Sequence, residues 1–526
     1  MQFPIVIYTL HHIIEEASKS APHAIAFSCL NKTLSYSELE LKANQLSYHL
    51  ISVGIQKGDR VGIFMNRCIE TAIAVYGILK SGAAYVPLDP FAPISRTVTI
   101  VDDCQIACLI STPQQQSKIN TLVKSVPRIK NVVGCEPMVG PSGTKWEDIF
   151  AQKATTAKRI EILEDDLAFI LYTSGSTGKP KGIMHTHYSA LSLAKIVVDT
   201  FDFDEDDIFG NPAPLHFDPS TFGYFVAPLV MAKTIIVPDA HLRLPVSLSA
   251  LIAKEKISVW YSVPLMLIQL LQSNTLNEHE FSSLRWVFFA GEVFIPKHLK
   301  ALMEVWPHAK YCNLYGPAEL ILCTYHELKE TITGEESIPI GRTWANTEHL
   351  VLNEQNQPVR NGETGELAVR SATLMRGYWN NVKLTEKSFH RIKIANGYDH
   401  IYYRTGDLVK LNKDGELLFL GRNDRQIKLR GYRIELDEVE SVFLKHEKVL
   451  EVAVVIIALE KEAQELAVAI KLKDDSDVSE AELRQFSSEH LPAYAVPTYI
   501  EIFDDFPRTS SGKINRRQIA DIIDQN

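Results

Sequence analysis

The stretch Leu171-Tyr-Thr-Ser-Gly-Ser-Thr-Gly-Lys-Pro-Lys-Gly182 is the most informative part of this 526-residue chain. It follows an apolar run, Leu167 to Tyr172, that is typical of a buried strand. Glycines let the backbone turn sharply and approach a ligand closely, so that several amides can point at one anion. The hydroxyl and ammonium groups between the glycines are donors that suit a polyphosphate. The stretch therefore predicts a phosphate-binding loop directly after a strand.

The loop does not match a Walker A motif, because Thr173 stands where that motif requires a glycine before the Gly178-Lys179 pair. A solvated Gly/Ser linker is the alternative that the loop alone leaves open. Further motifs elsewhere in the chain are needed to distinguish a phosphate-binding loop from a linker.

The bulk composition is that of a globular enzyme, with 46% hydrophobic and 22% charged residues. The length exceeds what one core usually supports, so we expect two or more domains. A net charge of −10 argues against a nucleic-acid partner. Seven cysteines without a Cys-x-x-Cys pair indicate reduced thiols, with neither a disulfide framework nor a zinc site.

We expect a cytoplasmic protein with no membrane partner. Met1 to Leu10 lacks the basic flank and the length of a signal peptide. The apolar stretch from Gly62 to Leu79 is interrupted by Arg67 and Glu70, so it is not expected to cross a bilayer.

Helical patterns alternate with short apolar strands through roughly the first 420 residues. Leu39 to Val53 and Ile69 to Leu79 have helical patterns, and Arg60 to Met65 and Ala83 to Pro87 read as strands. This alternation predicts an α/β fold with largely parallel sheets.

The composition changes near Gly421, where a charged, glycine-punctuated segment ending at Gly431 predicts a linker and a short hairpin. A helical face and two strands, Val452 to Leu459 and Glu465 to Leu472, are expected after it. The chain therefore divides into predicted domains 1–423 and 424–526, and a charged linker is where relative motion is expected.

Further motifs follow the same order as in one large family. They are Leu34-Ser-Tyr-Ser-Glu-Leu39, Leu79-Lys-Ser-Gly-Ala-Ala-Tyr-Val-Pro-Leu-Asp89, Asn313-Leu-Tyr-Gly-Pro-Ala-Glu319, Gly365-Glu-Leu-Ala-Val-Arg370, Tyr403-Arg-Thr-Gly-Asp-Leu408, Leu491-Pro-Ala-Tyr-Ala-Val-Pro497 and Ser511-Gly-Lys-Ile-Asn-Arg516. Together with the glycine-rich loop and the Gly421 segment, they resemble an adenylation domain of the acyl-/aminoacyl-AMP-forming superfamily, of the nonribosomal peptide synthetase type. The resemblance implies a large N-terminal lobe of layered α/β subdomains and a small, mobile α+β C-terminal lobe.

The resemblance also implies the reaction and its cofactors, ATP and Mg²⁺. A substrate carboxylate attacks the α-phosphorus of ATP, pyrophosphate leaves and an acyl adenylate remains bound. Lys513 is the implied catalytic residue, Glu319 the implied Mg²⁺ ligand, and Asp407 the acceptor for the ribose hydroxyls. The other implied ATP-binding residues are Thr173, Ser174, Gly175, Ser176, Thr177, Gly178, Lys181, Tyr315, Gly316 and Arg422.

For single residues, a purely structural role remains an alternative. Glu319 could be a surface helix-capping carboxylate, Tyr315 a core tyrosine, and Asp407 and Lys513 members of ordinary turns. Asp424 matches the hinge of the family, with a solvated loop residue as the alternative. Gly431 would let a pantetheine arm pass close to the backbone.

Phe217-Asp-Pro-Ser220 matches the signature of amino-acid-activating members, in which the aspartate pairs with the α-ammonium group of the substrate. The implied substrate-binding residues are Asp218, Pro219, Phe222, Tyr261, Phe288, Ala290, Leu314, Leu322 and Cys323. The lining is apolar apart from Asp218, so burial of a charged substrate side chain would be costly. The set resembles that of freestanding prolyl-AMP ligases, which implies L-proline as substrate and another small apolar amino acid as alternative.

The chain contains neither a His-His-x-x-x-Asp condensation signature nor a Gly-Gly-x-Ser carrier motif. The resemblance therefore implies transfer of the acyl group to a separate holo peptidyl carrier protein. An acyl-CoA synthetase and a non-catalytic sensor remain as alternatives. Asp218 argues against the synthetase, and the presence of Lys513, Glu319 and Asp407 together argues against the sensor. A metal pair at His185 and His187 is not expected, because residues i and i+2 of a strand face opposite sides.

Overall fold

The structure is a computed structural model. It describes residues 6–137, 140–152, 160–175, 179–328, 332, 337–458, 464–473, 478–508 and 514–525. The chain divides into two compact units. Unit 1 comprises residues 1–88, 104–171 and 182–423, and unit 2 comprises residues 89–103, 172–181 and 424–526.

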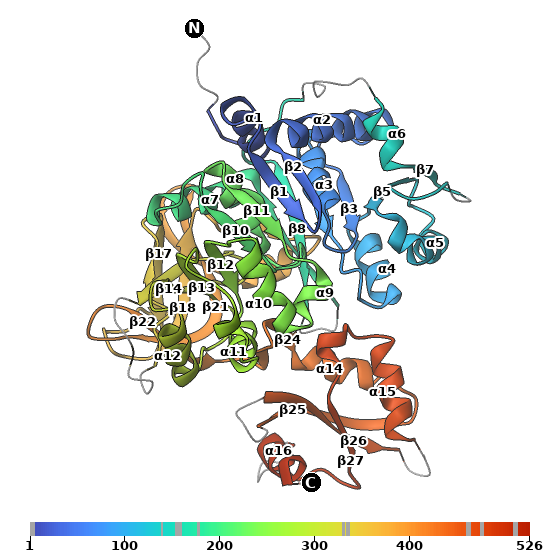
Figure 1. The fold of residues 1–526 in the computed structure, drawn as a ribbon. Helices are drawn as coiled ribbons and strands as arrows, with labels where there is room; N and C mark the ends of the chain where they lie inside the picture. The colour runs from blue at the N-terminus through green and yellow to red at the C-terminus, as the bar shows by residue number, and fades with distance from the viewer. Residues whose placement is uncertain are drawn as a thin grey trace. The chain divides into compact units, whose positions relative to one another are not determined.

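One large sheet follows the order β19-β9-β8-β4-β3-β5-β6-β7, and its strands β8, β3, β5 and β7 are labelled in Figure 1. Its strands are β3 (Arg60–Phe64), β4 (Ala84–Pro87), β5 (Cys108–Ser111), β6 (Asn131–Val133), β7 (Ser142–Thr144), β8 (Leu167–Thr173), β9 (Lys181–Thr186) and β19 (Gly377–Tyr378). The pairs from β8 to β7 are parallel. The predicted strand before the glycine-rich loop is confirmed as β8, whose residues 168–171 are buried.

The second large sheet follows the order β16-β15-β14-β13-β12-β10-β11-β1-β2. Its strands are β1 (Ile25–Cys29), β2 (Lys32–Ser35), β10 (Ile208–Asn211), β11 (Lys233–Ile236), β12 (Val259–Ser262), β13 (Trp286–Phe289), β14 (Lys310–Tyr315), β15 (Thr324–Leu328) and β16 (Arg342–Thr343). The pairs from β1 to β14 are parallel, and the two edges are antiparallel. These two sheets confirm the predicted α/β class.

The helices of the first 254 residues are α1 (His11–Ser20), α2 (Tyr36–Ser52), α3 (Ile69–Lys80), α4 (Ile94–Asp103), α5 (Gln116–Ser125), α6 (Trp146–Phe150), α7 (His187–Thr200), α8 (Ala227–Leu229), α9 (Asp239–Leu242) and α10 (Pro245–Lys254). They are followed by α11 (Pro264–Gln272), α12 (Pro296–Val305) and α13 (Val382–Lys387). Short turns of 3₁₀ helix are η1 (Pro113–Gln115), η3 (Leu276–Glu278) and η4 (Ala493–Ala495), and η2 (Phe222–Val226) is a π-helical turn. None of the described helices combines the length and the apolar character that crossing a bilayer requires.

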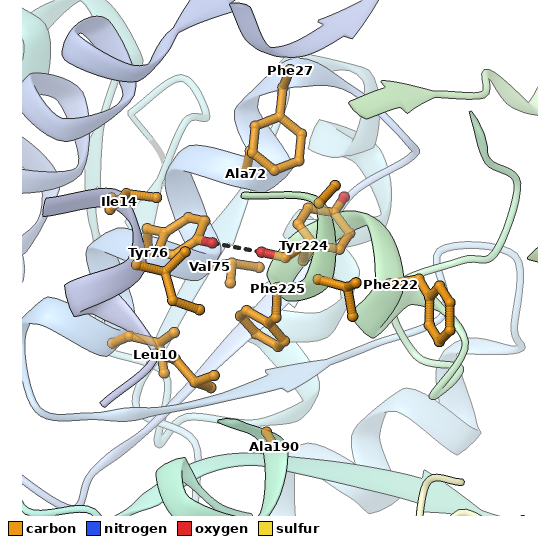
Figure 2. Close-up of a cluster of buried hydrophobic side chains, with 14 of the residues drawn as sticks. Leu10, Ile14, Phe27, Ala72, Val75, Tyr76, Ala190, Phe222, Tyr224 and Phe225 are labelled. Atoms are coloured by element: carbon orange, nitrogen blue, oxygen red, sulfur yellow. Dashed lines mark hydrogen bonds between the residues drawn. The ribbon is translucent and has the colours of Figure 1, made fainter. Parts of the chain in front are cut away.

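Every residue of helix α3 except Glu70 is buried, which fits its composition because residues 72–79 are apolar on all sides. The hydroxyl of its Tyr76 donates to the backbone oxygen of Tyr224 in η2 at 2.5 Å (Figure 2). Phe225 of the same turn contacts the Tyr76 ring edge-on at 6.2 Å. The core of unit 1 therefore continues from α3 to the π-helical turn.

Residues 347–422 differ from the predicted parallel pattern. They form the antiparallel sheet β17 (Thr347–Leu352), β18 (Gly365–Ser371), β21 (Tyr398–Leu411) and β20 (Phe389–Ala395), with β22 (Leu417–Arg422) paired to β21. For β20 and β21 the reason is local, because these strands are joined by Asn396-Gly397 alone, and Gly397 has φ +80°. An Asn-Gly pair favours a two-residue hairpin.

The part of unit 2 from residue 424 onward begins with the predicted hairpin, β23 (Gln426–Leu429) and β24 (Tyr432–Glu435). Its turn residues Arg430 and Gly431 both have positive φ, as a two-residue type I′ turn requires. A three-stranded sheet follows, with β25 (Val449–Ala458), β26 (Gln464–Leu472) and β27 (Tyr499–Ile502). The helices are α14 (Leu436–Phe443), α15 (Glu480–Ser488) and α16 (Arg516–Gln525). The α+β character expected for this part is confirmed.

The N-terminal helix is anchored through a buried histidine. The backbone N–H of Leu10 donates to Nδ1 of His187 at 3.1 Å. Burial lowers the pKa of His187 from its ordinary 6.5 to about 3; the charge of Asp166 opposes this shift, and His12 and Lys57 add to it. The neutral ring is therefore the form that accepts this hydrogen bond.

We predict that unit 1 loses stability as the pH falls below 6.5. In that range the unfolded chain binds a proton at His187 that the folded state excludes, which costs up to about 1.4 kcal/mol per pH unit. His187→Asn keeps an acceptor for Leu10 but does not titrate, so its urea midpoint should fall less between pH 7.5 and 5 than that of the wild type. Identical pH slopes for the two proteins would contradict this role.

Candidate active site

Tyr315, Asp407 and Arg422 lie together in unit 1. Tyr315 ends β14 and its hydroxyl donates to one carboxylate oxygen of Asp407, while the Arg422 guanidinium pairs with the other. Asp407 and Arg422 are cross-strand partners in β21 and β22, so the sheet register sets this ion pair. Burial, followed by the charge of Asp407, holds the pKa of Tyr315 well above its ordinary value. Asp407 is thus an enclosed carboxylate with both oxygens engaged.

Glu319 lies in the turn between β14 and β15 and is completely buried. Its carboxylate accepts a hydrogen bond from the Tyr378 hydroxyl at 2.7 Å. The preceding residue, Ala318, has its backbone oxygen 2.8 Å from Nε2 of His185. Burial lowers the pKa of His185 to about 4, so the ring is neutral, and Nε2 carries its hydrogen because a carbonyl oxygen can only accept. Nδ1 lies 3.2 Å from the Ser189 hydroxyl oxygen. The surface-carboxylate alternative for Glu319 is therefore wrong.

Gly316 is required by close packing in the same turn. A Cβ atom at this position would lie 2.5 Å from Cα of Leu322 and 2.6 Å from the backbone oxygen of Ile321. Ile321 itself has φ +59°, which is rare and strained for a β-branched residue. The turn that carries Glu319 is therefore tightly constrained.

The described part of the glycine-rich loop belongs to unit 2. The Thr173 hydroxyl oxygen is buried and has no hydrogen-bond partner among the described residues. The Ser174 hydroxyl donates to the backbone oxygen of Arg433 at 2.9 Å. A Cβ atom on Gly175 would lie 2.2 Å from the backbone oxygen of Lys179, so only glycine fits there. A buried hydroxyl without a partner, in a loop where a glycine allows close approach of the backbone, fits a bound phosphate.

The other predicted ATP-binding, catalytic and hinge residues are only partly described by the structure. Ser176, Thr177, Gly178 and Lys513 lie outside the described residues. Lys181 begins β9. Asp424 is the first residue of the C-terminal part of unit 2, and its carboxylate accepts from the backbone N–H of Gln426 at 3.1 Å.

The predicted substrate-binding residues gather at one part of the second large sheet. Phe222 contacts Tyr261 at 4.7 Å and Phe288 at 5.8 Å between ring centroids. Tyr261 and Phe288 are register partners in β12 and β13. The neighbouring Asp218 charge adds to burial in raising the pKa of Tyr261. A carboxylate therefore lies beside an aromatic cluster.

The remaining substrate-binding residues divide between two clusters. Ala290, Leu314 and Leu322 belong to the same buried cluster as Phe222. Cys323 packs instead with Tyr315 and Leu320. Pro219 follows Asp218, and its backbone oxygen accepts from the N–H of Phe222 at 3.2 Å. This turn leads into the π-helical turn η2, a feature often found at functional sites.

Sequence reasoning missed three contributors. Tyr378, Tyr403 and His185 surround the Glu319 turn, yet Tyr378 is 59 residues from Glu319 in the chain. No local pattern signals such a contact. The π-helical turn was missed as well, because its sequence differs from an ordinary helix in no visible way.

Comparison with known proteins defines the class. The AMP-binding enzyme family matches residues 14–379, and the AMP-binding enzyme C-terminal domain matches residues 438–513. The chain belongs to this family of adenylate-forming enzymes, which confirms the family resemblance.

Two relatives are similar over most of their length. An L-proline–[L-prolyl-carrier protein] ligase of Streptomyces coelicolor is 34% identical over 93% of this chain and 92% of its own. A ligase of the same name from Pseudomonas fluorescens is 31% identical over 97% of this chain and 98% of its own. A solved NRPS protein containing adenylation and PCP domains has a TM-score of 0.82 over 97% of this chain and 84% of that one, at 24% identity, and shows the fold.

We predict that Gly316→Ala weakens AMP binding. The added methyl group meets backbone atoms, so the turn that carries Glu319 must shift and the AMP affinity should fall. A displacement of about 1 Å near an active site can also lower the reaction rate on the order of 100-fold. The affinity should be measured by titration calorimetry. Gly397→Ala is the control for an added methyl group without a steric clash, because a Cβ atom there would meet nothing within 4 Å and the strain from its φ of +80° falls on the turn between β20 and β21. Equal AMP affinities for the two variants would contradict the prediction.

Proposed function

We propose that this enzyme activates an amino acid, with L-proline as the preferred substrate, and transfers it to a carrier protein. ATP and the amino acid would give an aminoacyl adenylate and pyrophosphate. The phosphopantetheine thiol of a separate holo carrier protein would then take the aminoacyl group and release AMP. Family membership supports the first step, and the names of the two relatives support proline and the carrier protein.

The nucleotide roles follow the family resemblance. The loop from Thr173 to Lys181 would hold the phosphates that leave, Asp407 would accept from the ribose hydroxyls, and Tyr315 with Gly316 would contact the adenine. Asp407 can take this role while paired with Tyr315 and Arg422, because each carboxylate oxygen has two acceptor sites.

Glu319 would hold Mg²⁺. A hard cation that bridges phosphates is often bound by only one or two protein carboxylates, and Glu319 is an enclosed oxygen donor of this kind. When bound, Mg²⁺ neutralises charge on the phosphates. The chain's own contribution is to fix the carboxylate and to exclude water around it.

Lys513 would stabilise the charge that develops between the attacking carboxylate and the α-phosphate. The proposed domains are 1–423 and 424–526, with Asp424 as the hinge. Rotation about this hinge would withdraw Lys513 after adenylation and admit the carrier's pantetheine arm.

The observation that carries the amino-acid assignment is the Asp218 carboxylate beside Tyr261 in an otherwise apolar cluster. A carboxylate there can pair with the ammonium group of an amino-acid substrate. A site for a fatty acid or an aryl acid would not need such a carboxylate, because those substrates have no ammonium group. The apolar surroundings favour a small uncharged side chain. The ring of proline presents only methylene groups to such surroundings.

An acyl-CoA synthetase and an activator of another small apolar amino acid are the alternatives, and a non-catalytic sensor is a more distant one. The proposed partners are thus the amino acid and the carrier protein, without nucleic acid or membrane. We place the reaction in the cytoplasm, where reduced thiols such as the seven cysteines persist.

Pyrophosphate exchange tests the substrate. Exchange of labelled pyrophosphate into ATP should be fastest with L-proline among the amino acids. In Asp218→Ala the kcat/KM for proline should fall at least about 100-fold, because the substrate ammonium group loses its partner. Cyclopentanecarboxylate lacks that ammonium group, so it should be rejected by the wild type and lose nothing further in the variant. A preference for carboxylates without an amino group would exclude the proposal.

Lys513→Ala should reduce proline-dependent exchange by about 100-fold or more while the affinity for AMP stays within about twofold, because the lysine acts on charge that develops only in the transition state. Lys473→Ala, at an exposed lysine of the same unit, is the control. Retained exchange in Lys513→Ala would contradict the catalytic role.

The acceptor is tested by mass spectrometry of the thioester. The holo carrier should be loaded, and the apo carrier and free CoA should not. Faster loading of CoA than of the holo carrier would favour the acyl-CoA synthetase.

A further inference from the structure

The carboxylate of Glu319 is held by Tyr378, whose hydroxyl lies beside that of a second tyrosine, Tyr403, within unit 1. Tyr378 is 3% exposed, and its hydroxyl donates to Oε1 of Glu319 at 2.7 Å. The hydroxyl of Tyr403, also buried, lies 3.4 Å from that of Tyr378. A phenol has one hydrogen to donate, and in Tyr378 that hydrogen goes to the carboxylate.

The backbone on both sides of Tyr378 limits its movement. Gly377 and Tyr378 form β19, which pairs in antiparallel register with Met184 and Ile183 of β9. The backbone N–H of Tyr378 also donates to the Thr385 hydroxyl at 2.9 Å. The backbone that carries the Tyr378 phenol is therefore fixed by the pairing of β19 with β9.

The backbone of Glu319 is anchored to the same segment. The N–H of Met375 donates to the backbone oxygen of Glu319 at 2.8 Å. Residues 375–378 thus bind the main chain and the side chain of Glu319 together. His185, which precedes Glu319 in the chain, binds the backbone oxygen of the neighbouring Ala318.

Two features of this arrangement are energetically unfavourable for the folded state. Burying a carboxylate is unfavourable, and Ile321 in the same turn has a strained left-handed backbone. Strain and buried charge that persist together are characteristic of a group kept for function. The tyrosine hydrogen bond fixes the orientation in which the carboxylate is available.

We propose that Tyr378 is a positioning residue that holds the Glu319 carboxylate in the orientation that binds the divalent cation of the nucleotide. This inference rests on the proposed function, because it takes Glu319 as the Mg²⁺ ligand. Tyr403 supports Tyr378 and acts more weakly. Removal of the Tyr378 hydroxyl should therefore weaken cation binding while leaving the nucleotide contacts in place.

The test is the Mg²⁺ concentration that half-saturates ATP binding, measured at equilibrium by calorimetry without amino acid and therefore without turnover. Tyr378→Phe should raise this concentration by about 10- to 100-fold, as is typical when a group that orients a metal ligand is removed. ATP affinity in the absence of Mg²⁺ should stay within about twofold of the wild type. Tyr403→Phe should raise the half-saturating concentration by a smaller factor.

Tyr36→Phe is the matched control, because the Tyr36 hydroxyl is equally buried and donates to the backbone oxygen of Ala232 at the same 2.7 Å. It should lower the thermal midpoint as much as Tyr378→Phe does and leave the Mg²⁺ dependence unchanged. In Glu319→Gln, a second change of Tyr378→Phe should have no further effect on cation binding.

The outcomes separate the two proposals. A wild-type enzyme whose ATP binding ignores Mg²⁺ would overturn the assignment of Glu319 and this inference with it. A wild type that requires Mg²⁺, combined with an unchanged requirement in Tyr378→Phe, would overturn only the inference. An equal change in Tyr36→Phe would show that the effect is one of general stability, and would also overturn it. If Tyr378→Phe does not fold, an unchanged Mg²⁺ requirement in Tyr403→Phe decides against the proposal.

Discussion

Parallel strand pairing is the constraint on which the rest of unit 1 depends. Parallel neighbours cannot be joined by tight turns, so their connections are long and their carboxyl ends meet at one edge. In the second large sheet β10, β12, β13 and β14 are neighbours in that order. The Asp218 turn follows β10, Ala290 follows β13 and Gly316 follows β14. The strand order alone thus places residues that are far apart in the chain at one edge of the sheet.

The second principle of the site is that buried carboxylates are held by tyrosines. Asp407 accepts from Tyr315 and Glu319 accepts from Tyr378, in each case across a long separation in sequence. A neutral phenol satisfies a carboxylate oxygen without cancelling its charge, whereas a lysine or arginine would do both. Glu319 and Asp407 differ in this respect, because Arg422 also pairs with Asp407. A carboxylate that is oriented by a neutral donor keeps more of its attraction for a cation.

Much of this could be predicted from the sequence because the relevant signals are local. The strand before the glycine-rich loop, the hairpin near Gly431 and the α/β alternation each depend on short patterns of glycines and apolar residues. The β20–β21 hairpin could have been predicted as well, since Asn396-Gly397 is a local hairpin signal. The contact of Tyr378 with Glu319 could not, because it depends on the register of β19 with β9. The roles of the site residues follow from resemblance and remain predictions.

The π-helical turn after Asp218 has a consequence for how this site can vary. A π-helical turn is an α-helix with one residue inserted, and each residue of an α-helix advances by about 100° around the axis. Loss of a single residue from η2 would therefore rotate Phe222, and the chain before it, relative to the helix that follows. Such a rotation would turn Phe222 away from Tyr261 and Phe288 without replacing any lining residue. In this fold the length of a helix, and not only the identity of its side chains, is a variable that evolution can use to reshape the proposed substrate-binding surface.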